Sequence, residues 1–220
     1  MLIGEGQVHV WRADLDGVND DVLGSLCQEE RARAKRFPNE HDGRLWQRAH
    51  GVLRALLGRY LDRDPGTLRF TAGAHGKPEL EQNPARGSQL SFNLSHSGTL
   101  ALFAFAFGEA VGVDVEVARR PLEEVAIAAR LFGPGEAQRL QGLEQGERER
   151  EFLRAWVRKE AELKCRGSGL AADTADAREA PVWIAELDVG PGAAAAVACE
   201  RSPLALRYLE WKRECSKTAP

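Results

Sequence analysis

The sequence has few of the features that mark secreted, zinc-binding or membrane-spanning proteins. Cys27, Cys165, Cys199 and Cys215 form no CxxC pair and have no matching histidine spacing, which argues against a zinc site and a disulfide scaffold. The N-terminal segment lacks the basic start and long apolar run of a signal peptide. The most apolar segment, LALFAFAFG, is too short to span a bilayer as a helix. We therefore expect a cytoplasmic protein with no membrane partner.

No charge of one sign dominates the chain. The net charge is −3, so a global basic field that would favour nucleic acid is missing, and we expect no nucleic-acid partner. Hydrophobic residues make up 43% and charged residues 29%, which is ordinary for a globular protein. A chain of 220 residues is long enough for one large domain or two small ones.

The pattern of elements runs twice along the chain. The first half predicts a strand at 7–15, helices at 19–37 and 41–61, and strands near 67–71, 89–95 and 99–107. The second half predicts a strand at 111–117, helices at 121–132, 133–143 and 150–165, a loop at 167–180, and strands at 181–189, 193–200 and 204–212. We therefore predict an α+β fold of two similar lobes, residues 1–110 and 111–220, with a ligand cleft between them.

Two charged residues of the predicted helix 150–165 lie on its apolar face. At ~100° per residue, Glu160 falls near ~80° and Lys164 near ~120° from Phe152. Both positions lie inside the apolar stripe, which is formed by Phe152, Leu163, Trp156, Leu153 and Val157. A carboxylate on a core-facing stripe is costly unless a cation, a metal or hydrogen bonds compensate it. Either these residues form a simple i,i+4 pair, or this face lines a polar site.

The strand VGVDVEV carries two carboxylates on one face. Asp114 and Glu116 are two residues apart, so their side chains lie ~7 Å from each other and suit a hard divalent cation such as Mg²⁺. Gly112 lies on the same face and would let a ligand approach the backbone. The alternative is a half-exposed strand with a solvated acidic face.

Three further segments offer groups for binding an anion. In FNLSHSG, Ser95 and His96 precede a tight turn that presents hydroxyls and backbone N–H groups, although a plain hairpin would look the same. The segment HGKPEL presents Lys77, which a solvated loop would also do. Arg44 and Arg48 lie one turn apart on the helix 41–61, a spacing that usually indicates a solvated face.

The order of these segments is more specific than any one of them. GKP, FNLSHS, VGVDVE and WVRKEAELK follow one another over residues 76–164. In this order the chain resembles the 4′-phosphopantetheinyl transferases of the larger, surfactin-synthetase-activating type. The resemblance extends from AKRF near residue 34 to GSGL near residue 167. It implies two α+β lobes related by a pseudo-twofold axis, with coenzyme A bound between them.

The resemblance also implies roles for single residues. Asp114, Glu116 and Glu160 would bind Mg²⁺, for which Mn²⁺ can substitute, and Glu160 would be the general base. Lys164 would contact a coenzyme A phosphate and assist the leaving group. Asp114 would also lie against the coenzyme, whose phosphates are held in the family at positions matching three residues of the GKP and FNLSHS motifs, which are Lys77, Ser95 and His96.

Other assignments from the resemblance are less direct. Glu136 matches an acidic position near the metal and would be auxiliary. Arg44 and Arg48 are candidates for gripping the nucleotide phosphate. His50 falls near a position where relatives carry arginine, which departs from the family pattern.

The function implied is transfer of the 4′-phosphopantetheine arm from coenzyme A to a serine of an apo carrier protein, with release of adenosine 3′,5′-bisphosphate. The carrier would be an acyl, polyketide or peptidyl carrier, and the enzyme would act as a monomer. A non-catalytic module that binds coenzyme A or carriers, and a Mg²⁺-dependent hydrolase of a nucleotide pyrophosphate, could carry similar residues. A structural two-lobed protein that matches all four motifs by coincidence is the remaining alternative.

Overall fold

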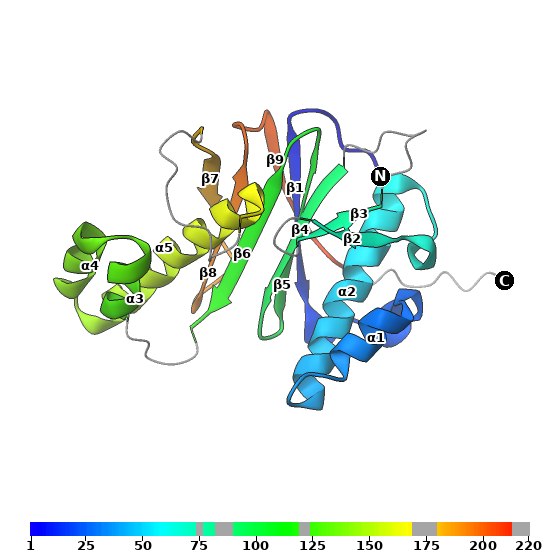
Figure 1. Cartoon of the computed structure of the whole chain (residues 1–220), viewed down its shortest axis with the longest axis horizontal. Coiled ribbons are helices and arrows are strands. Elements are labelled where there is room, and N and C mark those ends of the chain that lie inside the picture. The colour runs from blue at the N-terminus through cyan, green and yellow to red at the C-terminus, as the bar shows by residue number, and fades with distance from the viewer. Residues whose placement is uncertain (74–76, 82–89, 119–123, 169–179, 213–220) are drawn as a thin grey trace.

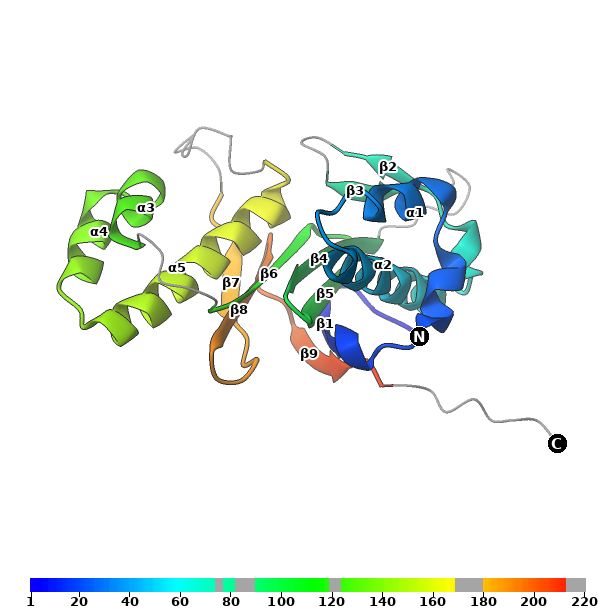
Figure 2. The same ribbon diagram turned by 90° about the horizontal axis from the view of Figure 1, so that it is seen from below.

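The computed structural model describes residues 1–73, 77–81, 90–118, 124–168 and 180–212. Its main elements form four layers, because two β-sheets stand face to face between two long helices (Figures 1 and 2). This arrangement confirms the predicted α+β class. Among the described residues, no helix is both long enough and apolar enough to cross a bilayer.

The elements are distributed between two larger sheets and a small hairpin. The first sheet has the order β4-β5-β1-β9 and contains β1 (Gln7–Asp14), β4 (Leu90–Ser97), β5 (Leu100–Phe107) and β9 (Ala205–Glu210). The second has the order β6-β8-β7 and contains β6 (Val111–Val117), β7 (Trp183–Glu186) and β8 (Ala193–Cys199). The hairpin pairs β2 (Phe70–Ala72) with β3 (Pro78–Leu80).

The described helices are α1 (Gln28–Ala34), α2 (Glu40–Leu61), α3 (Glu124–Leu131), α4 (Pro134–Gln141) and α5 (Gln145–Arg166). Short 3₁₀ turns cover η1 (Leu15–Gly17), η2 (Asp20–Ser25) and η3 (Pro65–Thr67). The helix α2 covers the first sheet and α5 covers the second, while α3 and α4 pack beside the N-terminal half of α5 (Figure 2).

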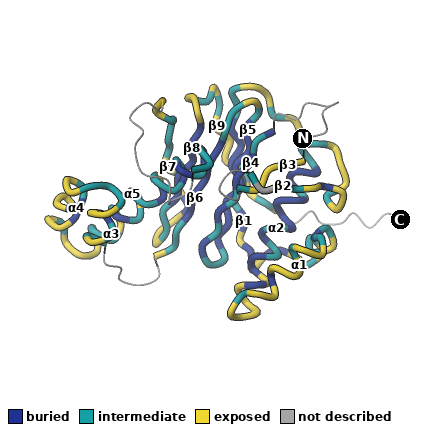
Figure 3. The backbone as a smooth tube through the Cα atoms, in the orientation of Figure 1, coloured by how far each residue is buried: buried dark blue, intermediate teal, exposed yellow. Residues whose placement is uncertain are grey.

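The first sheet is buried on both faces. Along β5, Phe103 and Phe105 point toward α2 and pack against Leu53 and neighbouring residues. Leu102 and Ala104 point the other way, into the space between the two sheets. This double burial explains why β5 is a continuous apolar run rather than an alternating one. Figure 3 shows the buried backbone concentrated in these central strands.

A shared apolar core joins the two sheets. It contains alternate residues of β1, β5, β6 and β8, which are Val8, Val10, Leu102, Ala104, Val113, Val115 and Val197. Because both sheets contribute to one core, the halves of the chain meet over a broad dry surface. A ligand cannot enter there, and a site between the halves must lie at the edge of this contact.

Helix α5 lies unusually close to the second sheet. Ala196 and Ala198 on β8 face the helix, and Gly112 on β6 leaves room for its backbone. A Cβ added at Gly112 would overlap the carbonyl oxygen of Ala161 and the backbone nitrogen of Cys165. The sequence-based interpretation of Gly112 as an opening for a ligand is therefore wrong, because the helix itself occupies that space.

A buried arginine attaches α1 to the rest of the first half. Arg54 on α2 is only 2% exposed, and its Nε lies 2.9 Å from Oε2 of Glu30 on α1. Its Nη1 donates to the carbonyl oxygens of Pro65 and Leu68 at 2.9 and 3.2 Å. A buried charge of this kind is tolerated only because its donors are satisfied.

The predicted helix over 19–37 is wrong, because the segment contains η2 and α1 with a break between them. Leu26 and Cys27 are extended at the break, and Leu26 is buried. The guanidinium of Arg31 donates to the carbonyl oxygens of Leu23 and Leu26, which replaces the lost helical bonds. Helical periodicity does not reveal such a break.

Two other boundaries differ from the sequence prediction. Helix α5 begins at Gln145 rather than at 150, so the polar run before the predicted start forms its first turns. The strand β3 was not predicted, and β2 covers Phe70–Ala72 rather than 67–71. The predicted helix start at Pro121 and most of the predicted loop at 167–180 lie outside the described residues.

The last strand returns to the first sheet. Although β9 belongs to the second half of the sequence, it pairs in parallel with β1, with Val8 opposite Leu206 and Val10 opposite Tyr208. The division into lobes 1–110 and 111–220 stays a prediction, and β9 shows that the first sheet also uses residues beyond 111.

We expect Gly112→Ala to lower the free energy of unfolding by ~1–3 kcal/mol or more, because a methyl group forces α5 away from β6. Chemical denaturation measures the change. Gly135→Ala is the matched control, since it lies on α4 and an added Cβ there meets nothing within 4 Å. Equal stability of Gly112→Ala and the wild-type protein would contradict the packing described here.

Candidate active site

Lys164 on α5 forms an ion pair with Asp114 on β6. Its Nζ lies 2.5 Å from Oδ1 of Asp114 and 3.0 Å from Oγ of Ser95 on β4. The contact joins three elements that are distant in the sequence. The ionic partner of Lys164 is thus across the sheet–helix interface, and a simple i,i+4 pair with Glu160 does not account for its inward orientation.

Asp114 is almost fully buried. It is 3% exposed, and its Oδ1 also accepts a hydrogen bond from the hydroxyl of Ser95 at 2.7 Å. Its Oδ2 is buried and has no hydrogen-bond partner among the described residues. An anionic oxygen left without a donor is costly, so this atom indicates a place for a cation.

Glu116 follows two residues later on the same face of β6. The hydroxyl of Ser97 donates to its Oε2 at 2.8 Å, and the side chain is half-buried. Both carboxylates of this strand therefore face β4 rather than solvent. The alternative of a solvated acidic face is wrong for Asp114 and does not describe Glu116.

Glu160 lies one helical turn before Lys164 on α5. Its side chain is half-buried, and its Oε1 is buried without a hydrogen-bond partner among the described residues. The pKa of the Glu160 carboxyl is raised, mainly by burial. Nearby Lys164 opposes the shift, and the negative charges of Asp114 and Glu116 add to it. Positive charge brought to this carboxylate would stabilise its ionised form.

The chemistry of these carboxylates fits a divalent cation. Asp114, Glu116 and Glu160 offer the hard oxygen donors that Mg²⁺ prefers, and two of these oxygens are buried with no partner among the residues described. Within the described part of the chain, no three His, Cys, Asp or Glu residues stand close enough together to hold an ion as they are. The three-residue ligand set therefore stays a prediction.

A pocket of about 510 Å³ adjoins these groups. It lies among α1, α2, β4 and the C-terminal part of α5, and its walls include Arg33, Trp46, His50, Ser95, His96 and Lys164. The volume falls in the usual range for small-molecule sites. Cationic side chains on opposite walls make the pocket suitable for a ligand with phosphate groups.

Comparisons with known proteins show the family to which this chain is related. The family described as "4′-phosphopantetheinyl transferase superfamily" matches residues 110–212, and the one described as "4′-phosphopantetheinyl transferase, N-terminal" matches residues 11–107. The 4′-phosphopantetheinyl transferase HetI of Nostoc sp. is 36% identical over 207 residues, covering 87% of each chain. The chain belongs to the 4′-phosphopantetheinyl transferase superfamily.

Two further relatives support this membership. The 4′-phosphopantetheinyl transferase Sfp of Bacillus subtilis is 28% identical over 153 residues, covering 70% of this chain and 65% of Sfp. The 4′-phosphopantetheinyl transferase AcpT of Salmonella typhimurium is 37% identical over 134 residues, covering 57% of this chain and 66% of AcpT. The predicted family and enzyme class are confirmed.

In this transferase, Lys77 binds protein rather than facing the pocket described above. Its Nζ donates to the carbonyl oxygens of Val111 at 3.0 Å and Lys164 at 2.7 Å. Burial lowers the pKa of Lys77, and its side chain also lines a second cavity of about 540 Å³. These contacts hold the end of α5 against β6, and the predicted role of Lys77 at a coenzyme A phosphate stays a prediction.

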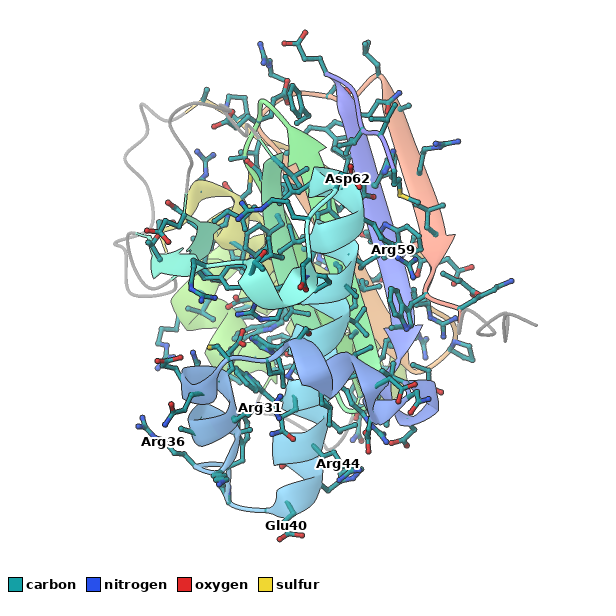
Figure 4. All side chains as sticks on the ribbon, turned by 90° about the vertical axis from the view of Figure 1, so that its right-hand side faces the viewer. Arg31, Arg36, Glu40, Arg44, Arg59 and Asp62 are labelled. Atoms are coloured by element: carbon teal, nitrogen blue, oxygen red, sulfur yellow. The ribbon has the colours of Figure 1, made fainter. Side chains whose placement is uncertain are left out.

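Arg44 and Arg48 lie on the other side of α2 from the pocket. Arg44 forms an ion pair with Asp20, and Arg48 binds Asp20 at 3.0 Å and the carbonyl oxygen of Leu15 at 3.0 Å. Figure 4 shows Arg44 on the outer surface near the N-terminal end of α2. The structure does not bring these two arginines to the pocket, because α2 turns ~200° between Arg48 and His50.

Glu136 is also remote from the carboxylates. It lies on α4, where both of its oxygens bind Arg139, at 2.7 and 3.0 Å. Arg139 in turn contacts Glu151 at 3.3 Å, near the N-terminal end of α5. Nine residues separate Glu151 from Glu160, which corresponds to ~14 Å along the helix. The structure therefore gives no support to the predicted auxiliary role of Glu136 near the metal.

Sequence analysis missed the aromatic wall of the pocket. The rings of Trp46 and His50 stack at 3.6 Å, and His50 Nδ1 lies 2.9 Å from the carbonyl oxygen of Trp46. The guanidinium of Arg33 lies 5.4 Å from the centre of the Trp46 ring. The i,i+4 spacing of the two aromatic residues could be read from the sequence. The position of Arg33 could not, because the sequence predicted one continuous helix over 19–37 and therefore the wrong orientation for α1.

Burial lowers the pKa of His50 to about 4, so His50 is neutral at pH 7 and adds no charge to the pocket. An unfolded histidine has a pKa of ~6.5, so the unfolded state binds the proton more readily. Stability attributable to His50 is therefore present above pH ~6.5 and is lost as the pH falls toward 4.

We expect His50→Asn to lose less thermal stability than the wild-type protein between pH 7 and pH 4.5, because the variant lacks this protonation. Thermal unfolding followed by circular dichroism at both pH values measures the difference. His41→Asn, at an exposed position of the same helix, is the control. Parallel losses in all three proteins would contradict the predicted effect.

Proposed function

We propose that this enzyme transfers the 4′-phosphopantetheine arm of coenzyme A to a serine of an apo carrier protein and releases adenosine 3′,5′-bisphosphate. The observation that carries the proposal is the convergence of Lys164, Asp114 and Glu160 beside a pocket with cationic walls. A non-catalytic binding module needs a pocket but has no use for a half-buried carboxylate with a raised pKa.

Coenzyme A would bind in the 510 Å³ pocket, with its phosphates toward the cationic groups. Lys164, which pairs with Asp114, lines this pocket, and so do His96 on β4 and Arg33 on α1. Charge-assisted hydrogen bonds to phosphate are among the strongest that side chains make. This supports the phosphate-binding roles predicted for Lys164 and His96. Ser95 instead donates a hydrogen bond to the carboxylate of Asp114.

Asp114, Glu116 and Glu160 would hold a divalent cation, which when bound supplies positive charge that neutralises the pyrophosphate and draws electron density from its bridging oxygen. Two buried oxygens, Oδ2 of Asp114 and Oε1 of Glu160, have no hydrogen-bond partner in the described part of the chain, which supports this assignment. Mg²⁺ is the expected ion, because all donors are carboxylate oxygens.

Glu160 is the proposed general base. A serine hydroxyl is a weak nucleophile until its proton is removed, and the carboxylate of Glu160 is a group that can accept that proton. As the serine oxygen bonds to the phosphorus of the pantetheine phosphate, its proton passes to Glu160. The bond from this phosphorus to the bridging oxygen breaks, and the electron pair leaves with adenosine bisphosphate.

Lys164 is the group proposed to stabilise the departing phosphate. Its ammonium lies on the pocket wall and is only part-buried, so it can contact a phosphate there. Negative charge grows on the bridging oxygen as the bond breaks, and a fixed cation lowers the energy of that state. The backbone carbonyl of Lys164 is itself held by Lys77, which limits movement of this part of α5.

An intact-mass assay tests the proposal. The purified protein is mixed with coenzyme A, Mg²⁺ and apo carrier domains of the acyl, polyketide and peptidyl types, with and without EDTA. The expected result is a gain of one phosphopantetheine arm on at least one carrier, abolished by EDTA. Coenzyme A binding with no gain on any carrier would favour a binding module, and release of free phosphopantetheine without a carrier would favour a hydrolase.

We expect Glu160→Gln to fold normally and to lower kcat by ~10²–10⁴-fold, because the amide cannot accept the serine proton. The initial rate of carrier modification measures the loss, and circular dichroism checks the fold. Glu162→Gln is the matched control, since Glu162 lies on the same helix and pairs with Lys159 and Arg166 instead. A near-native rate for Glu160→Gln would remove Glu160 from the mechanism.

A further inference from the structure

The open edge of β6 is covered by side chains of β4 rather than by its backbone. The N–H groups of Val113, Val115 and Val117 donate to Asn93 Oδ1, Ser95 Oγ and Ser97 Oγ, at 2.9, 3.4 and 3.1 Å. The offset between partners is 20 residues at every step, so the two strands run parallel in a fixed register. On its other edge β6 pairs with β8 through the backbone.

Each serine of this side-chain ladder also binds a carboxylate. Ser97 accepts from Val117 and donates to Oε2 of Glu116 at 2.8 Å. Ser95 accepts from Val115 and donates to Oδ1 of Asp114 at 2.7 Å. A hydroxyl has one hydrogen and two lone pairs, so a backbone N–H can fix the oxygen while the hydrogen points at the acid.

The geometry follows from the period of the two strands. Side chains alternate along β4, so Asn93, Ser95 and Ser97 share the face toward β6, while Phe92 lies in the core under α2. Backbone N–H groups along an edge strand also point to the same side at every second residue. One side-chain oxygen of β4 therefore matches every second residue of β6. The carboxylates at 114 and 116 precede the N–H groups at 115 and 117 and are therefore within reach.

We propose that Ser97 is a positioning residue for Glu116, fixing the direction of its carboxylate for the cation, as Ser95 does for Asp114. This inference rests on the proposed function. Ser97 touches no proposed substrate group and lies outside the pocket walls described above, so its effect must pass through Glu116. Its side chain is buried, at 6% exposure, and it is thus not an ordinary surface serine.

Ser97 allows a cleaner test than Ser95. Ser95 also accepts a hydrogen bond from Lys164 at 3.0 Å and lines the pocket, so its removal would disturb ligand binding as well. Asn93 supplies the matched control. It covers Val113 in the same ladder at 2.9 Å, and no carboxylate contact of Asn93 is among those described. Asn93 also lines the pocket, so its variant is compared with the others only at saturating coenzyme A.

The probe is Mn²⁺, titrated into the full-length protein with saturating coenzyme A and no carrier, and followed by the electron paramagnetic resonance signal of free Mn²⁺. We expect Ser97→Ala to raise the Kd for Mn²⁺ by ~10–100-fold, the range seen when partners of metal ligands are removed. Asn93→Ala should change this Kd by less than about twofold. It should nevertheless lower Tm about as much as Ser97→Ala does.

Two more variants separate positioning from simple damage to the fold. Ser97→Thr keeps the hydroxyl and should return the Kd for Mn²⁺ to near the wild-type value. Ser97→Cys keeps the size of the side chain, but a thiol donates only a weak hydrogen bond. It should therefore weaken Mn²⁺ binding, and it serves as the test if Ser97→Ala folds poorly. Coenzyme A binding in EDTA should be unchanged in the serine variants, because Ser97 does not reach the pocket.

The inference is overturned if Ser97→Ala and Ser97→Cys bind Mn²⁺ like the wild-type protein, or if Asn93→Ala weakens binding as much as they do. Either result would make the ladder purely structural. Failure of the proposed function looks different. In that case the wild-type protein itself leaves every carrier unmodified in the intact-mass assay, whatever the variants do.

Discussion

The side-chain ladder between β4 and β6 is the contact on which the rest of the site depends. Among the described strands, β6 has backbone pairing on one edge, with β8. Its other edge would leave N–H groups without acceptors beside a dry core. Asn93, Ser95 and Ser97 supply those acceptors without merging the two sheets. Because the serine hydroxyls also donate, the same contact holds the acids of β6 in one orientation.

The site concentrates polar groups where burial is expensive. Asp114 is 3% exposed, Glu160 has a raised pKa, and Lys77 is held by two carbonyl oxygens. Such groups are tolerated when hydrogen bonds and opposite charges satisfy them. The apolar core between the sheets and the core under α2 stabilise the frame around them. Buried charged groups of this kind, in a fold whose other buried residues are mostly apolar, are typical of functional sites.

Long periodic segments were predictable because local pattern decides them. The apolar face of α2 and the alternation of VGVDVEV follow from spacing alone, and both elements are where the sequence places them. The helix predicted over 19–37 failed, because the break at Leu26 and Cys27 depends on a buried leucine and on Arg31 reaching back to η2. Gly112 was misread for a similar reason, since the helix that approaches it lies about fifty residues further along the chain.

The sequence by itself determined the family, through four ordered motifs, and the inward orientation of Glu160 and Lys164, through helical periodicity. Only the tertiary structure decided what these groups meet. In the structure Lys164 pairs with Asp114, and Lys77 binds two carbonyl oxygens. Arg44 and Arg48 bind Asp20 on the side of α2 away from the pocket, and β9 pairs with β1 in the first sheet. Periodicity fixes the face on which a side chain lies, whereas its partner depends on how distant segments pack, and no local pattern encodes that distance.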